Sequence, residues 1–283
     1  MPLPRVVSIR LGSSGTPLAR RHELVGTGRA TRRRVTIPWS SFERTRYPAP
    51  ALALALSAQR ALALGEYGAV HLFARLASGV SLNAAPLDLV LAAASVPADE
   101  ARHSELALRM AELFSGEPAE VRLDRSGVPK AAWTPMEIEE VDLAMIEICA
   151  IGETLAAALL AACRDIAKDP VPRALFTSLT GDEVHHARLG WYYLAWRAPQ
   201  WSRAERQRAA DRAGAMVAQV ERGFWKGRDA PPGSRRAARA LGVLDSPTQR
   251  RVIRSIMEDE IVPGLDALGL GASHAWRVRV RGS

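Results

Sequence analysis

The stretches DEARH at residues 99–103 and DEVHH at residues 182–186 decide the fold of this chain. Both follow one pattern, Asp-Glu-x-x-His, inside segments rich in Ala, Leu and Arg, which favour helices. Residues three apart share one face of a helix, so the Glu and the His of each stretch can bind one metal ion together. One Glu-x-x-His match is a weak signal, because it arises readily by chance. Two matches, both preceded by Asp, predict a metal-binding element repeated on two helices.

Two further glutamates follow a glycine in apolar sequence, Glu66 in ALALGEYGA (61–69) and Glu153 in EICAIGETLA (147–156). The chain therefore repeats a pair of helices, with Gly-Glu on the first and Asp-Glu-x-x-His on the second. The neighbours of Glu66 and Glu153 on their helix faces are largely apolar, so both side chains are expected to point into the interior. A bound cation would remove the high cost of burying these carboxylates. Glu147 is the alternative ligand candidate on the third expected helix, but it lies off the apolar face that carries Glu153.

This set resembles the ligands of the ferritin-like carboxylate-bridged di-iron superfamily, in which two helices each supply a Glu and two others each supply a Glu-x-x-His. The resemblance covers about residues 50–196 and does not identify a subfamily. It implies two bound iron ions, with manganese as an alternative, since hard oxygen and nitrogen ligands suit both metals. It implies no catalytic residue beyond the metal ligands, which are Glu66, Glu100, His103, Glu153, Glu183 and His186.

The resemblance also divides the ligands between two metals. Those expected to serve mainly one metal are Glu66, Glu100 and His103, and those for the other are Glu153, Glu183 and His186. Glu100 and Glu183 are the expected bridges. Asp99 and Asp182 stand where several oxygen-activating members place a carboxylate that bonds the His of the opposite pair and fixes its tautomer. The rival interpretation is two solvated Glu-x-x-His pairs on helix surfaces, with Asp99 and Asp182 as ordinary surface acids.

The pattern predicts an all-α protein, a ferritin-like four-helix bundle with additional C-terminal helices and an extended N-terminal arm. The expected helices span residues 51–77, 85–114, 135–168, 172–196 and 203–226, with a last one from 246. Ser78 and Gly79 should end the first helix, and Pro97 should kink the second. Thr134 and Glu137 form a predicted capping box at the start of the third, and Pro263 should bend or stop the last.

Three regions are expected along the chain. Residues 1–48 form an extended basic arm with a short strand around 35–37, residues 49–198 the di-metal bundle, and residues 199–283 helices packed on it. The net charge is +8, and arginine clusters such as that at 29–34 contribute much of the excess. A solvated basic surface is the favoured interpretation and nucleic acid is disfavoured as a partner. No secretory signal or membrane span is expected, and two cysteines form no disulfide framework, so the cytoplasm is the expected compartment.

The resemblance implies an oxidoreductase that activates dioxygen to oxidise a small organic substrate, with an electron donor that the sequence does not identify. One alternative is a ferroxidase, a peroxide scavenger or a di-manganese catalase-like protein. Another is a hydroxylase that modifies RNA bound by the basic arm. Leu179 stands where a third His would lie in aryl-amine N-oxygenases, which disfavours that subfamily. A homodimer stays open, and His185, beside the ligand stripe, is expected to face solvent or a neighbouring helix.

Overall fold

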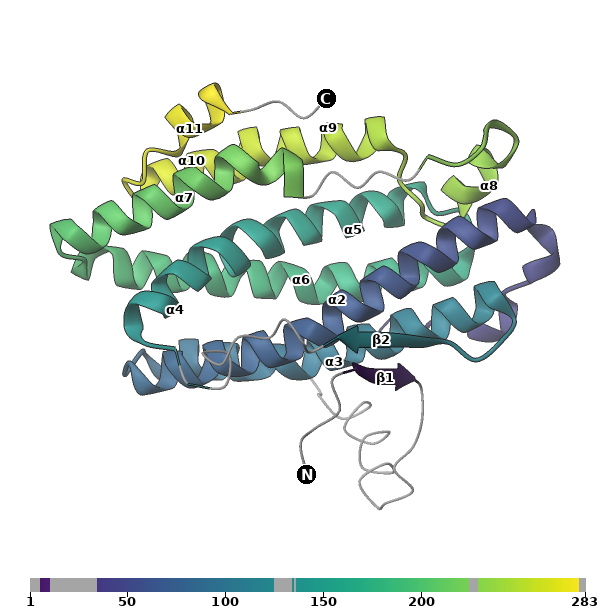
Figure 1. Ribbon diagram of the computed structural model, residues 1–283, viewed down its shortest axis with the longest axis horizontal. Helices are drawn as coiled ribbons and strands as arrows, with labels where there is room; N and C mark the ends of the chain where they lie inside the picture. The colour runs from purple at the N-terminus through teal and green to yellow at the C-terminus, as the bar shows by residue number, and fades with distance from the viewer. Residues whose placement is uncertain (1–5, 11–34, 125–133, 135, 224–228, 280–283) are drawn as a thin grey trace, which may run out of the picture.

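Helices dominate the structure, a computed structural model that describes residues 6–10, 35–124, 134, 136–223 and 229–279 (Figure 1). The prediction of an all-α protein is confirmed, apart from one pair of short strands. The long central helices of the described chain are α2 (Ala49–Leu82), α3 (Leu87–Ser115), the continuous run of α4 (Ile138–Ala144), η4 (Met145–Glu153) and α5 (Thr154–Ile166), and α6 (Pro170–Arg197).

The central helices form two packed pairs. α2 lies along α3, and α6 lies along η4 and α5, while α3 contacts α6 and joins the pairs (Figure 1). A layer of C-terminal helices covers the second pair, with α7 against α4 and η4, and α9 against α5. That layer comprises α7 (Arg203–Gly223), α8 (Arg235–Ala240), α9 (Ser246–Ile256), η7 (Met257–Ile261), α10 (Val262–Ala267) and α11 (Ala272–Val278). The largest apolar core joins both layers, for example through Ile146, Leu189, Val217 and Ile253.

Side-chain caps explain two of the helix starts. The Asp169 carboxylate accepts a hydrogen bond from the backbone of Val171 at 2.9 Å, which caps α6. At α7, the Ser202 backbone donates to Glu205 at 2.7 Å and the Glu205 backbone donates to the Ser202 hydroxyl at 3.2 Å, which forms a capping box. The predicted box at Thr134 is wrong, because Glu137 and Glu140 form it three residues later and α4 begins at Ile138.

The predicted end of the first helix at Ser78 and Gly79 is wrong, because α2 continues to Leu82. Gly79 instead marks a close crossing with the start of α4. A Cβ atom at Gly79 would lie 2.6 Å from Cγ2 of Val141 and 2.9 Å from the carbonyl oxygen of Met136. The glycine was therefore selected by packing against a neighbouring helix rather than by helix termination.

Two prolines differ in their effects on the helices. Pro97 lies inside α3, which continues through it to Ser115. Pro263 lies directly after the π-helical segment η7, and the helical run continues through it into α10 rather than stopping. The last helical run is thus divided into α9, η7 and α10.

The strand expected at residues 35–37 is wrong, because these residues carry no regular structure. Strand β1 (Val6–Arg10) instead pairs antiparallel with β2 (Glu120–Asp124), with Val6 opposite Asp124 and Arg10 opposite Glu120. The arginine cluster at 29–34 lies outside the described residues. The division into an arm, a bundle and C-terminal helices stays a prediction.

The run from Ile138 to Ile166 is long and apolar enough to cross a membrane by length and composition, with a mean hydropathy of 1.9. No membrane span was expected from the sequence, because glycine and charged residues interrupt such segments, here Glu147, Gly152 and Glu153. Of its most apolar window, 56% is buried inside the protein, and the core helix of a soluble protein passes the same test. In this fold it is the helix that lies between α6 and the C-terminal layer.

Candidate metal centre

The six side chains expected to bind metal meet in the interior, between the two helix pairs. Glu66 comes from α2, Glu100 and His103 from α3, Glu153 from the end of η4, and Glu183 and His186 from α6. Glu100, Glu183 and both histidines have side chains that are at most 2% exposed, whereas Glu66 and Glu153 are 14% exposed. The surface interpretation of the two Glu-x-x-His pairs is therefore wrong.

These side chains form two groups that could each hold a metal ion. One group is Glu100, Glu153, Glu183 and His186, and the other is Glu66, Glu100 and His103. Within each group, one ligand atom of every residue lies within 4.8 Å of the others. Glu100 belongs to both groups, and the rings of His103 and His186 lie 5.8 Å apart. The groups are thus neighbours that share a carboxylate.

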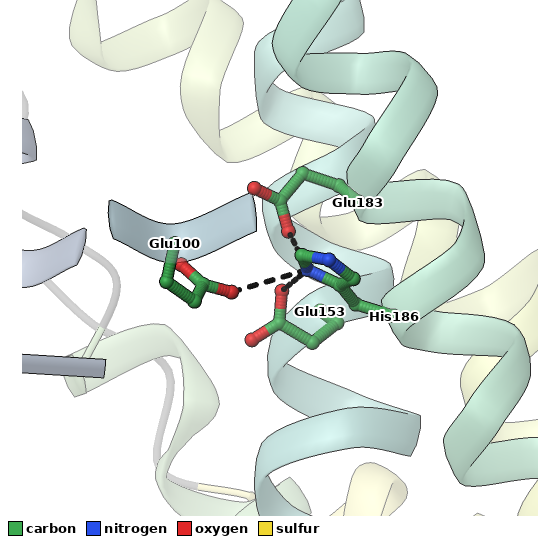
Figure 2. Close-up of side chains that lie close together, drawn as sticks. All are labelled: Glu100, Glu153, Glu183 and His186. Carbon is green, nitrogen blue, oxygen red and sulfur yellow. Dashed lines mark hydrogen bonds and ion pairs between the residues drawn. The ribbon is translucent and has the colours of Figure 1, made fainter. Parts of the chain in front are cut away.

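Both histidines turn Nδ1 toward the carboxylates. Nδ1 of His186 lies 3.1 Å from Oε1 of Glu100, 3.2 Å from Oε2 of Glu183 and 3.8 Å from Oε2 of Glu153 (Figure 2). Nδ1 of His103 lies 3.0 Å from Oε1 of Glu183, 3.7 Å from Glu66 and 3.9 Å from Oε2 of Glu100. Glu100 and Glu183 therefore each direct one oxygen toward one histidine and the other oxygen toward the second. This position suits the bridging role expected of them.

The outer nitrogens of the histidines face the aspartates of the opposite pair. Nε2 of His103 lies 3.2 Å from Oδ2 of Asp182, and Nε2 of His186 lies 3.6 Å from Oδ2 of Asp99. Asp182 is thus hydrogen-bonded to His103, whereas Asp99 lies opposite His186 at ion-pair distance. A carboxylate at Nε2 holds the proton there and leaves Nδ1 free to bind a cation.

The local backbone brings Glu153 into the cluster. The residues from Met145 to Glu153 form a π-helix, a feature that often occurs at functional sites. Gly190 of α6 packs directly on this segment, because a Cβ atom at Gly190 would lie 2.5 Å from the backbone nitrogen of Ala150. Sequence reasoning predicted an uninterrupted α-helix here, and it missed both the π-helix and the close contact.

Burial and mutual repulsion shift the protonation of the carboxylates. Burial, and then the nearby Glu66 and Glu183, raise the pKa of Glu100 to about 10. Burial and Glu183 raise the pKa of Glu153 well above its usual range. Glu183 behaves oppositely, because hydrogen bonds with Glu153, His103 and His186 outweigh burial and hold its pKa well below the usual range. The group therefore shares protons among its members in place of a cation.

The pKa values of the two histidines are raised. Burial lowers the pKa of an imidazole, but contacts with the surrounding carboxylates outweigh it and raise the pKa of both His103 and His186. Oε1 of Glu100, Nδ1 of His103 and Nε2 of His186 are among the buried atoms of the described residues that meet no full hydrogen-bond geometry, although the first two lie 3.1 Å from Nδ1 of His186 and 3.0 Å from Oε1 of Glu183. Close carboxylate oxygens and imidazole nitrogens that are buried but not fully hydrogen-bonded fit a hard cation such as iron or manganese.

Other candidates lie outside the cluster. Glu147 turns away and pairs with Arg212 at 2.7 Å, so it is excluded as the rival of Glu153. His185, His71 and His274 are exposed. Leu179, one turn before Glu183, is fully buried and offers no third His.

Two neighbours of the cluster were given no role by sequence reasoning. Cys149 lies one turn before Glu153, and its pKa is raised by burial and by the charge of Glu153. Arg102, next to His103, donates hydrogen bonds to Asp182 and Ser178. The spacing of Cys149 from Glu153 would have been a usable signal, whereas nothing in the pattern singles out Arg102.

The structure thus establishes a buried Glu and His cluster that could bind metal in an all-helical protein. Searches of the chain against known protein families, curated proteins and solved structures found no match.

Proposed function

We propose that the protein is a non-heme di-iron oxidoreductase with a ferritin-like four-helix bundle, which uses dioxygen to oxidise a small organic substrate. The observation that carries the proposal is the crossed arrangement at the two histidines. Each Nδ1 faces shared carboxylates, and each Nε2 faces an aspartate of the opposite helix. Such an arrangement supports both histidines as metal ligands, because a merely structural ion-pair cluster does not require it.

The residues of each half have separate roles in holding the irons. Those that would hold one ion are Glu66, Glu100 and His103, and those that would hold the other are Glu153, Glu183 and His186. Glu100 and Glu183 lie between the histidines and would contact both ions. Asp182, hydrogen-bonded to His103, and Asp99, 3.6 Å from His186, would keep the proton of each histidine on Nε2. Two irons bound there supply the reduction of dioxygen and an oxidant for C–H or N–H bonds.

The surrounding residues control access to the centre. The buried ring of Phe73 lies 6.0 Å from that of His186, which gives this side of the centre an apolar wall. Glu66 and Glu153 are the more exposed ligands, so substrate and dioxygen are expected to approach from their side. The compartment is proposed to be the cytoplasm.

The test is metal content per chain by elemental analysis, with absorption spectra of the reduced protein before and after exposure to oxygen. We expect about two irons per chain and an oxygen-dependent band. Glu183→Ala and His103→Ala should each abolish stoichiometric binding while helicity, measured by circular dichroism, persists. His185→Ala is the matched control, because His185 is exposed beside His186, and it should keep both irons.

Other results decide between the alternatives. Two manganese ions would favour a catalase-like protein, and iron turnover without oxidation of any organic substrate would favour a ferroxidase. RNA affinity that falls with salt would favour the RNA hydroxylase. No metal after anaerobic Fe(II) loading would refute the proposal.

A further inference from the structure

Arg102 precedes His103 in α3 and reaches across to α6. Its Nη2 atom donates to Oδ2 of Asp182, and its Nη1 atom donates to the hydroxyl of Ser178 at 3.1 Å. The same Oδ2 atom lies 3.2 Å from Nε2 of His103. Arg102 and His103 therefore meet at one carboxylate oxygen, and the side chains of Arg102 and Asp182 are only 24% and 12% exposed.

This contact fixes the carboxylate on which His103 depends. Ser178 and Asp182 lie one turn apart on α6. A planar guanidinium that bonds both therefore fixes the position of the Asp182 carboxylate relative to α3. Asp182, held in this way, keeps the proton on Nε2 of His103 and directs Nδ1 toward Glu66 and Glu183.

The other half of the cluster differs in sequence at the equivalent position. Arg102 of the stretch 99–103 corresponds to His185 of the stretch 182–186. An imidazole is shorter than an arginine side chain and lacks its fork of N–H donors. The support of His103 is therefore chemically different from that of His186.

We propose that Arg102 is a positioning residue for one half of the metal centre. It strengthens cation binding by the half that contains Glu66 and His103, and it does not affect the half that contains Glu153 and His186. Because the two halves bind the pair of ions, this role rests on the proposed function. It makes the two metal positions unequal in a way that the six ligands alone do not.

The experiment isolates each half and measures Co(II) binding by calorimetry and absorption. Glu153→Ala leaves the His103 half, and Glu66→Ala leaves the His186 half. Adding Arg102→Met to Glu153→Ala should weaken Co(II) binding about tenfold, because outer partners of metal ligands typically matter at this level. Adding the same change to Glu66→Ala should alter the affinity less than about twofold.

Two controls separate positioning from charge and from general damage. Arg102→Lys keeps the positive charge but lacks the forked pair of N–H donors. Added to Glu153→Ala, it should therefore weaken Co(II) binding as Arg102→Met does, and Co(II) affinity equal to that of Glu153→Ala alone would overturn the proposal. Arg188→Met makes the same substitution at an exposed arginine beside His186 and should change neither half. If Arg102→Met lowered the Co(II) affinity of both halves equally, or of neither, the role of Arg102 would be overturned while the proposed metal centre would not be contradicted. A wild-type protein that binds no Co(II) would instead contradict the proposed function.

Discussion

At the scale of single residues, Glu100 shows most clearly why a cation suits this cluster. Its side chain is buried, it faces His186 at 3.1 Å, and it belongs to both groups of candidate ligands. Burial and the neighbouring Glu66 and Glu183 raise its pKa to about 10, so without a cation it carries a proton at neutral pH. A divalent ion would replace that proton and compensate the remaining carboxylates.

We therefore expect metal binding to release protons and to strengthen as the pH rises. Because the pKa of Glu100 in the metal-free fold is raised from 4.5 to about 10, the ion competes with a proton throughout pH 6 to 8. Each proton released should raise the apparent affinity by about tenfold per pH unit. Calorimetric titrations in buffers of different ionisation enthalpy give the number of protons directly. Equal affinity at pH 6 and pH 8 would show that Glu100 is already ionised.

The six candidate ligands could be predicted from two physical rules, whereas the roles of both aspartates came from the resemblance to the di-iron superfamily. Residues three apart share a helix face, and an internal repeat makes Glu66 equivalent to Glu153. Arg102 could not be predicted, since it fills an unconstrained position of the pattern and reaches a residue 80 positions later. Contacts of that kind depend on how two helices pack, which the pattern of one helix does not specify.

At the scale of elements, the predictions that were wrong concern positions where a neighbouring helix determines the local structure. Gly79 resembled a helix end and is a crossing point, and the π-helix at Met145–Glu153 looked like ordinary apolar helix. The pairing of Val6–Arg10 with Glu120–Asp124 joins segments far apart in the chain, and no local signal specifies such a register. A local cap such as the box of Ser202 and Glu205 follows from the sequence, because its partners lie three residues apart.

Gly190 tests the contact between α6 and the π-helix. In Gly190→Ala, the new Cβ would lie 2.5 Å from the nitrogen of Ala150 and 2.6 Å from Cβ of Cys149. The two helices must separate, which should cost about 1–3 kcal/mol in the free energy of unfolding and move Glu153 away from Glu183. We expect lower stability in urea titrations and weaker metal binding.

Gly181 provides the matched control on the same helix. A Cβ atom at Gly181 would have nothing within 4 Å, so Gly181→Ala should raise stability by up to about 1 kcal/mol through helix propensity alone. Metal binding should not change. Similar effects of both substitutions would show that the close approach at Gly190 does not position Glu153.

At the scale of the whole molecule, a buried polar network ties the metal-bearing helices to the C-terminal layer. Asp142 of α4 accepts hydrogen bonds from the Tyr193 hydroxyl at 2.8 Å and from the Trp201 indole at 2.7 Å. Nε of Arg197 lies 3.2 Å from Asp142, and Nη2 of Arg197 donates to Glu205 of α7 at 2.7 Å. Every member lies outside the metal cluster. The network should therefore set the stability of the assembly without setting its metal content.

Arg197→Met tests this division of roles. The substitution leaves the Asp142 carboxylate, in a residue only 4% exposed, without its cation, which should lower the free energy of unfolding by roughly 3 kcal/mol at pH 7. Burial already raises the pKa of Asp142, and the loss of Arg197 removes a charge that opposes this rise. The penalty should then shrink as the pH falls toward 5, because the folded variant takes up a proton that relieves the buried charge. Urea titrations at both pH values measure this difference.

Arg164→Met is the control for Arg197→Met, since Arg164 forms a 2.8 Å pair with Asp165 whose side chains are 34% and 62% exposed. Such a pair contributes little, so stability should change by less than about 0.5 kcal/mol at either pH. Both variants should bind metal as the wild type does. If Arg197→Met instead lost metal while its unfolding free energy stayed within that margin, the network would belong to the metal centre, and the C-terminal layer would act on its chemistry rather than on its stability.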